Sequence, residues 1–182
     1  MTVLIRMKKG LAKPVNDGGS LIAIDPGNNG ALLGWHEAPI PGEELGMPDL
    51  YIPISNDLTG AKNLEREVLR KMHGVRTLLV EDQFVGMNAN SALMTAFSAG
   101  VIAGIIISTI TVDRLVLMKP ANWQSSLPKD DGPRKGPGKR RALALAEAKI
   151  PDLLAKISTK PRRQGAADTF GIAHWFVHPS SP

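Results

Sequence analysis

Three acidic residues could form a carboxylate cluster that does chemistry. Asp25 and Glu81 each follow a short apolar run, and Asp168 lies in a mostly apolar stretch near the C-terminus. Carboxylates that gather at one place repel one another and need cations, and their oxygen atoms suit Mg²⁺ or Mn²⁺. Two such ions about 4 Å apart can activate a water molecule and stabilise the leaving oxygen in phosphodiester hydrolysis. The three acids are therefore candidate metal ligands.

Asp25 is placed by the residues on both sides of it. Residues 21–24 read Leu-Ile-Ala-Ile, which predicts a buried strand, and Pro26-Gly27 ends that strand abruptly. The chain then turns and resumes as a second strand at 31–35. Asp25 is thus held at the carboxyl end of a strand, where ligands of α/β sheets gather. The same stretch also fits an ordinary Asx-type turn.

Glu81 and Asp168 have comparable settings. Residues 75–80 predict a central strand, and Glu81 follows its last residue. Asp168 falls in the first turns of a helix predicted over 166–177. If the strands before Asp25 and Glu81 are neighbours, all three acids converge at one edge of the sheet.

The rest of the chain alternates strand and helix patterns. Further strands are expected at 50–54 and 114–118, and further helices at 58–73, 91–107, 139–149 and, for a short turn, after Pro151. The proline within 50–54 suits an edge strand. Small residues in the 91–107 helix permit tight packing inside the domain or a dimer seam. The pattern indicates an α/β domain in which helices flank a mixed sheet.

Composition limits the possible functions. The 182 residues are 43% hydrophobic but only 4% aromatic, which favours an aliphatic α/β core over a β-sandwich. The chain has no cysteine, so disulfides, thiol nucleophiles and Cys-ligated zinc are excluded. The net charge of +5 mildly favours a polyanionic partner.

The N-terminal residues differ from the rest of the chain. Residues 1–19 are basic and are expected to form a flexible extension, and residues 20–182 a single domain. No secretory signal is evident, and the most apolar run, 99–108, is too short to cross a bilayer. We therefore expect a cytoplasmic protein without membrane association.

Three blocks of sequence resemble a known family. Residues 24–27, Ile-Asp-Pro-Gly, with Gly30 after them, resemble the first-strand motif of RuvC-type Holliday junction resolvases in the RNase H-like superfamily. Residues 81–93 resemble the second catalytic block of that family, and residues 165–173 resemble its C-terminal metal-binding helix. The blocks occur in the family's order, and the similarity runs from about residue 21 to 178.

The resemblance implies an RNase H-like fold, a five-stranded mixed β-sheet flanked by α-helices. It implies a homodimer that binds four-way DNA junctions and makes paired, symmetric nicks with Mg²⁺, for which Mn²⁺ can substitute. Asp25, Glu81 and Asp168 would be both metal ligands and catalytic residues. A bacterial or phage-type protein is expected rather than an organellar one.

Several residues are expected to contact DNA. Phe84 matches an aromatic residue that the family places against bases of the opened junction, although it could also pack beneath its own loop. Basic residues in a Gly/Pro-rich loop and the following helix start match DNA-contacting lysines of the family, and a solvated basic face is the alternative. The full set is Phe84, Asn88, Lys119, Arg134, Lys135, Lys139, Arg140 and Arg141.

The chain departs from the family pattern near Asp168. Relatives usually carry a fourth acid, or a histidine, three or four residues before the last acid, where this chain has Gly165 and Gln164. Glycine cannot bind a metal and a glutamine carbonyl is a weak ligand, so a second ion would bind loosely unless Asp130 or Asp131 assists. The lysine expected after the 114–118 strand is also missing, and Trp123-Gln124 stands there.

These departures keep a second function open. The alternative is a non-cleaving or weakly active branched-DNA-binding protein on the same fold. An RNA–DNA hybrid nuclease is a further possibility. A sugar-kinase-like phosphotransferase would need a second nucleotide-binding lobe, for which 182 residues leave little room.

Overall fold

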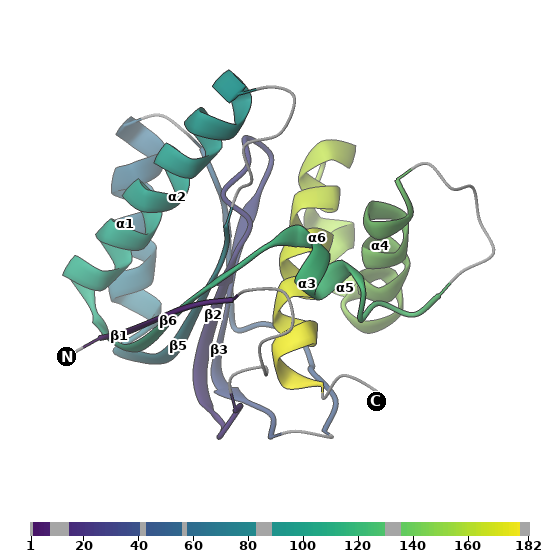
Figure 1. Cartoon of the computed structure of the whole chain (residues 1–182), viewed down its shortest axis with the longest axis horizontal. Coiled ribbons are helices and arrows are strands. Elements are labelled where there is room, and N and C mark those ends of the chain that lie inside the picture. Colours follow the sequence, from purple (N-terminus) through teal and green to yellow (C-terminus); the bar gives the residue numbers. More distant parts are fainter. Residues whose placement is uncertain are drawn as a thin grey trace.

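A computed structural model describes residues 2–7, 15–40, 43–55, 58–82, 89–129 and 136–178. Its strands are β1 (Val3–Arg6), β2 (Gly19–Ile24), β3 (Ala31–Ala38), β4 (Leu50–Pro53), β5 (Gly74–Glu81) and β6 (Thr111–Met118). Its helices are α1 (Leu58–Lys71), α2 (Ala89–Thr109), α3 (Pro120–Gln124), α4 (Pro137–Lys149), α5 (Pro151–Lys156) and α6 (Lys160–Val177). Figure 1 shows one sheet between two helical layers.

The strand order β1-β6-β5-β2-β3-β4 brings the acid-bearing strands together. β2 is parallel to β5, with Ile24 opposite Val80, and β5 is parallel to β6, with Glu81 opposite Met118. Because parallel strands end at the same edge, the residues that follow β2, β5 and β6 share one rim of the sheet. The strands before Asp25 and Glu81 are neighbours, which is the condition under which the acids are expected to converge.

The sheet has six strands rather than the predicted five. The additional strand, β1, comes from the segment that the sequence assigns to a flexible extension, and it pairs in parallel with β6 from Val3↔Arg114 to Arg6↔Leu117. The backbone N–H of Met7 continues the ladder to the carbonyl of Leu117 at 2.8 Å. For residues 3–6 the expected extension is therefore wrong. Val3 and Leu4 stay 55% and 63% exposed, so no burial pattern marks this strand in the sequence.

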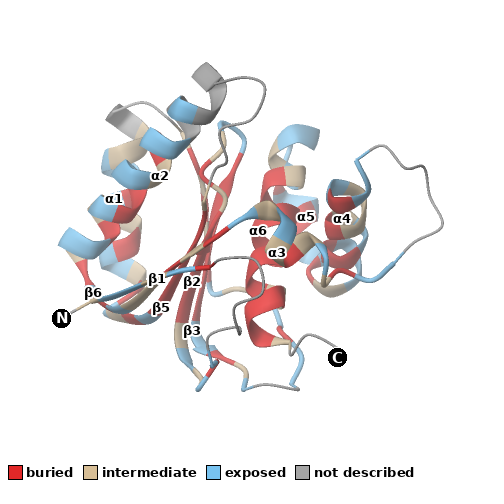
Figure 2. Cartoon of the chain, viewed as in Figure 1, coloured by how far each residue is buried: buried red, intermediate tan, exposed pale blue. Residues whose placement is uncertain are grey.

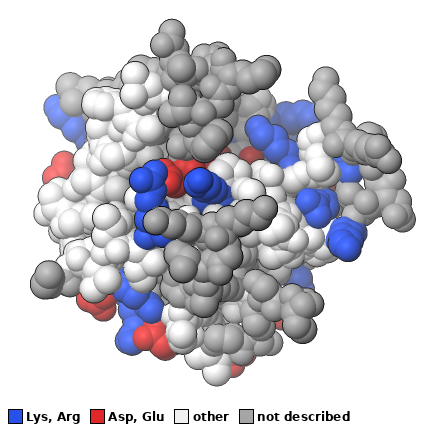
Figure 3. Space-filling model, in the orientation of Figure 1, with Lys and Arg blue, Asp and Glu red and all other residues white. Residues whose placement is uncertain are grey.

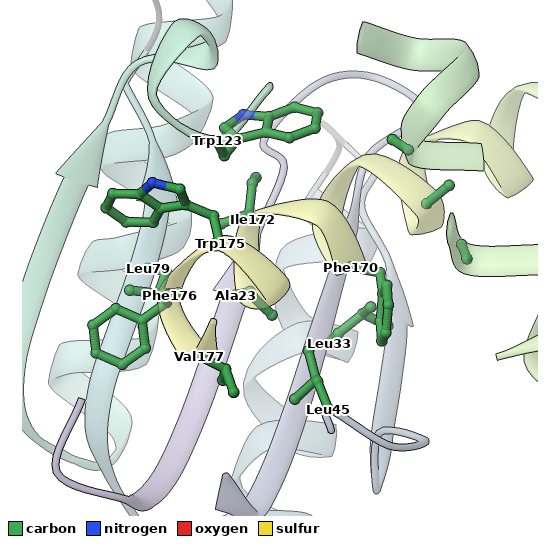
Figure 4. Close-up of a cluster of buried hydrophobic side chains, with 14 of the residues drawn as sticks. Ala23, Leu33, Leu45, Leu79, Trp123, Phe170, Ile172, Trp175, Phe176 and Val177 are labelled. Carbon is green, nitrogen blue, oxygen red and sulfur yellow. The ribbon is translucent and has the colours of Figure 1, made fainter. Parts of the chain in front are cut away.

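Two apolar cores hold the layers together. On one face, α1 and α2 pack on the sheet around fully buried residues such as Val68, Leu78 and Ile106. On the other face, α6 lies against the sheet and is backed by α4 and α5, and Figure 2 shows it buried over most of its length, with its first turn exposed. Figure 4 shows Phe170, Ile172 and Trp175 of this helix within that second core.

The remaining predicted elements agree with the structure in type and order. β4, with Pro53 as its last residue, is the edge strand opposite β1. The helix predicted at 91–107 is longer at both ends. Within the described residues, no helix is both long and apolar enough to span a membrane.

Candidate metal centre

The three predicted acids line one cleft of about 430 Å³ at the carboxyl rim of the sheet. Asp25 follows β2, Glu81 ends β5 and Asp168 lies on α6. The other walls come from the β2–β3 turn and from the starts of α3, α4 and α6. They comprise Gly27, Asn28, Asn29, Gly30, Pro120, Trp123, Gln124, Lys139, Pro161, Gln164 and Gly165.

Asp25 is fixed by the tight turn between β2 and β3. Its backbone N–H donates to the carbonyl of Ala31 at 3.1 Å, and its Oδ1 accepts the N–H of Gly27 at 3.0 Å. A Cβ at Gly30 would lie 1.9 Å from the Asp25 carbonyl oxygen, so the turn closes only around glycine. The Asx-type turn thus exists, and it orients a carboxylate that also lines the cleft.

Glu81 is held by a tryptophan. Its side chain is buried, with 7% exposure, and Oε1 accepts a hydrogen bond from Trp123 Nε1 at 3.1 Å. Trp123 lies on α3 and is itself 1% exposed. The bond joins the end of β5 to the helix that follows β6.

Asp168 is held by the residue one helical turn before it. Gln164 Nε2 donates to Asp168 Oδ1 at 2.9 Å and also to the backbone carbonyl of Lys139 at 2.9 Å. Turning the amide over would place its oxygen against two acceptors, so the network fixes the nitrogen toward Asp168. Gln164 therefore presents a donor, not a ligand oxygen, to this acid.

Gly165 is required by the close approach of α6 to the β2–β3 turn. A Cβ at this position would lie 1.8 Å from the carbonyl oxygen of Asn29 and 2.9 Å from Cα of Gly30. Both obstacles are backbone atoms, which cannot rotate out of the way. No side chain, acidic or otherwise, fits at position 165.

The electrostatics of the cleft disfavour the ionisation of both Asp25 and Asp168 when no cation is bound. Burial raises the pKa of Asp168 to about 7; the nearby Asp25 carboxylate adds to the increase, while the Gln164 hydrogen bond and Lys139 oppose it. Burial also raises the pKa of Asp25, against the effects of the Gly27 N–H and of Lys139. Acids in such a setting gain from a bound cation, which removes the cost of their ionisation.

A solved structure shares this architecture. Thermus thermophilus RuvC in complex with Holliday junction substrate matches the chain with a TM-score of 0.53 and 15% sequence identity, over 86% of this chain and 91% of that one. The fold is that of RuvC. A second Thermus thermophilus RuvC structure matches with a TM-score of 0.48 and 16% identity, over 86% of this chain and 93% of its own. No protein-family model and no curated protein matches the sequence.

The RuvC fold confirms the predicted class, an RNase H-like α/β sheet with flanking helices. Within the described residues, no three acidic or histidine side chains lie close enough to hold a metal ion jointly. Asp25 and Asp168 line the same cleft, and the Asp25 carboxylate contributes to the raised pKa of Asp168. Glu81 lines the same cleft, with one oxygen turned to Trp123.

The predicted DNA-binding residues have different settings on the RuvC fold. Phe84, Asn88, Arg134 and Lys135 lie outside the described residues, and their roles stay predictions. Lys119 is exposed directly after β6, and Lys139 is exposed on the wall of the cleft. In Figure 3, acidic atoms near the centre of this face have basic side chains on both sides.

Arg141 points into the protein instead. Its guanidinium donates to the backbone carbonyls of Gln124 at 3.1 Å, Leu127 at 3.4 Å and Pro137 at 3.2 Å. These bonds fasten the start of α4 to the segment after α3. Neighbouring Arg140 is half-buried. The basic cluster 139–141 is thus divided between the cleft wall and the scaffold.

Sequence reasoning missed two contacts of the acidic residues at the end of β5, Glu81 and Asp82. Trp123 was noticeable only as an unusual residue after Pro120, and nothing in the spacing links it to Glu81, 42 positions earlier. Arg6 bonds Asp82 Oδ2 through Nε and Nη2, both at 2.9 Å, beside Glu81. That contact depends on β1, which the sequence does not reveal.

Proposed function

We propose that this protein is a metal-dependent endonuclease that resolves four-way DNA junctions by paired nicks. The observation that carries the proposal is the convergence of Asp25, Glu81 and Asp168 in one cleft, from three separate elements of a RuvC fold. The matching RuvC structure holds a Holliday junction substrate. A basic net charge of +5 is compatible with a DNA partner.

Different residues of the cleft would bind the metal ion and the DNA. Asp25 and Asp168 would hold Mg²⁺ or Mn²⁺, with Glu81 as the third carboxylate of the cleft. The bound ion supplies Lewis-acid activation of the phosphodiester. Lys139 offers an ammonium group to the DNA backbone at the cleft wall, and Lys119 offers another at the same rim. Phe84 and Asn88 would contact bases near the junction.

Paired nicks require two active sites, and α2 supports a homodimer. Leu93, Phe97 and Val101, spaced four residues apart on one helix face, are 66%, 66% and 40% exposed. Exposed apolar residues that form a stripe mark an interaction surface. We expect the wild-type protein to sediment as a dimer. The Phe97→Asp variant should sediment as a monomer, and it should bind junctions with a lower affinity than the wild type.

The second candidate is a protein that binds branched DNA without cutting it. The observation that favours it is the absence of an acid at positions 164 and 165, where Gln164 donates to Asp168 and Gly165 admits no side chain. Binding through basic residues does not need a ligand at these positions, whereas hydrolysis with two metal ions does.

The test compares a synthetic four-way junction with a linear duplex of matched sequence, in Mg²⁺, Mn²⁺ or EDTA. Symmetric nicks in the junction alone, lost in EDTA, would support the nuclease. Asp25→Asn and Glu81→Gln should abolish these nicks and leave junction binding largely intact, because neutralising a metal ligand does not remove phosphate contacts. Selective binding without nicks in either metal would support the second candidate. Normal cutting by both variants would contradict the assignment of the acids.

A further inference from the structure

We infer that the cleft binds one divalent cation per chain, rather than the two that paired-metal hydrolysis uses. The inference rests on the proposed function, since it takes Asp25 and Asp168 as metal ligands. Its basis is the pair Gln164 and Gly165, which stand where a ligand for a second ion is needed. Gln164 turns its amide nitrogen toward Asp168, and Gly165 has no room for a side chain.

Gln164 is committed as a hydrogen-bond donor. Its Nε2 serves two acceptors at once, Asp168 Oδ1 and the Lys139 carbonyl, each at 2.9 Å. An ion that replaced this nitrogen would break both bonds and leave a backbone carbonyl without that partner. The same nitrogen also takes one acceptor site of Asp168 Oδ1.

Gly165 cannot be replaced by a ligand because α6 touches the β2–β3 turn there. The space for a Cβ is filled by the Asn29 carbonyl at 1.8 Å. This turn also positions Asp25, so moving it to make room would displace a proposed ligand. Among the described residues that line the cleft, the only acids are Asp25, Glu81 and Asp168.

Lys139 supplies positive charge that a second ion would otherwise bring. It lines the cleft and acts electrostatically on both Asp25 and Asp168. Three ionised carboxylates carry three negative charges, and one divalent ion with Lys139 balances them. A second divalent ion would leave the DNA-free cleft with two surplus positive charges and, among the described residues, no further acid to hold it.

The experiment counts bound Mn²⁺ by electron paramagnetic resonance and by calorimetry. The samples are the protein alone and the protein incubated with a four-way junction until any reaction is complete. Gln164→Glu adds a carboxylate next to Asp168, and Gln124→Glu adds one elsewhere on the cleft wall as the matched control. Thermal unfolding with and without Mn²⁺ confirms that each variant is folded.

We expect one Mn²⁺ per chain for the wild type and for Gln124→Glu. We expect two for Gln164→Glu, with the spin coupling of a close Mn²⁺ pair. Two ions in the wild type would overturn the inference and leave the proposed nuclease intact. One ion in both wild type and Gln164→Glu would refute Gln164 as the determinant. No bound Mn²⁺ in any sample would overturn both the inference and the metal-dependent function.

Discussion

The indole N–H of Trp123 donates to Glu81 Oε1 at 3.1 Å, and both side chains are buried. The same ring packs against α6 at Gly171, where a Cβ would lie 2.8 Å from Trp123 Cζ3. Trp123 therefore joins the strand that carries one acid to the helix that carries another. This bond orients the Glu81 carboxylate through a neutral donor.

The first prediction concerns this bond. Trp123→Phe keeps an aromatic ring but removes the N–H, which leaves a buried carboxylate short of one donor at a cost of about 1–3 kcal/mol in the free energy of unfolding. We expect a cleavage rate at least tenfold lower and a weaker affinity for Mn²⁺, measured by single-turnover kinetics and calorimetry. The matched control is Trp35→Phe, which loses a similar bond, from Nε1 to the Gly46 carbonyl at 3.1 Å, away from the cleft. Equal loss of activity in both variants would mean that Trp123 acts only through packing and not through its hydrogen bond to Glu81.

The second prediction separates two neighbouring basic residues. Lys139→Ala should weaken junction binding and lower the salt dependence, the slope of log Kd against log salt, by about one, because one phosphate contact is lost. Arg141→Ala should leave this slope unchanged. It should instead lower the free energy of unfolding by about 1–3 kcal/mol, because three backbone carbonyls lose their donor. Binding titrations over a salt series and urea unfolding distinguish the two variants. A reduced slope for Arg141→Ala would mean that Arg141 contacts DNA.

The third prediction concerns the packing of α6 on the β2–β3 turn. Gly165→Ala places a methyl group 1.8 Å from the Asn29 carbonyl, so helix or turn must move. Overpacking of this kind costs about 1–3 kcal/mol or more, and we expect lower stability together with loss of metal binding. Gly165→Asp should fail for the same reason and not gain activity. Gly74→Ala is the control, since its Cβ meets only the Thr111 carbonyl at 3.8 Å. If Gly165→Ala is as stable as the wild type, the β2–β3 turn can move to make room for a side chain, which would contradict the prediction.

The sequence predicts a strand where its side chains are buried, and it misses a strand that backbone hydrogen bonds hold. An apolar run that ends in an acid predicts both the strand and the position of the acid. The apolar residues of 21–24 and 75–80 are buried in the sheet, so Asp25 and Glu81 lie at its edge. The collinear motifs then add the RuvC fold. β1 escaped prediction because an edge strand is held by backbone bonds to β6, while three of its four side chains stay exposed.

The contacts of Gln164 and Arg141 escaped prediction for another reason. Gln164 reads in the sequence as a weak ligand, and only the carbonyl of Lys139, brought there by α4, turns its amide into a donor. Arg141 reads as part of a basic patch, but the segment after α3 surrounds its guanidinium with carbonyls. Both roles depend on contacts between distant elements, which no local pattern encodes.

The last prediction concerns the cost of keeping Asp168 buried. Its pKa is raised from the ordinary value of 3.8 to about 7, chiefly by burial, so the folded protein binds this proton more tightly than the unfolded chain does. The contribution of Asp168 to stability is therefore most favourable below pH 4, and it is lost progressively as pH rises from about 4 to 7. Above pH 7 the ionised group destabilises the metal-free fold by about 2–4 kcal/mol.

Asp168→Asn removes that ionisation and keeps an oxygen that can accept the Gln164 bond. In EDTA at pH 8 we expect the variant to be more stable than the wild type by about 2–4 kcal/mol, with the difference vanishing near pH 4. Mg²⁺ should stabilise the wild type and close the gap, since the cation binds the ionised form. Urea unfolding across this pH range measures the effect, with Glu65→Gln on the exposed side of α1 as the control. A variant no more stable than the wild type at pH 8 would mean that Asp168 is already compensated without metal, and its assignment as a ligand would lose its main electrostatic support.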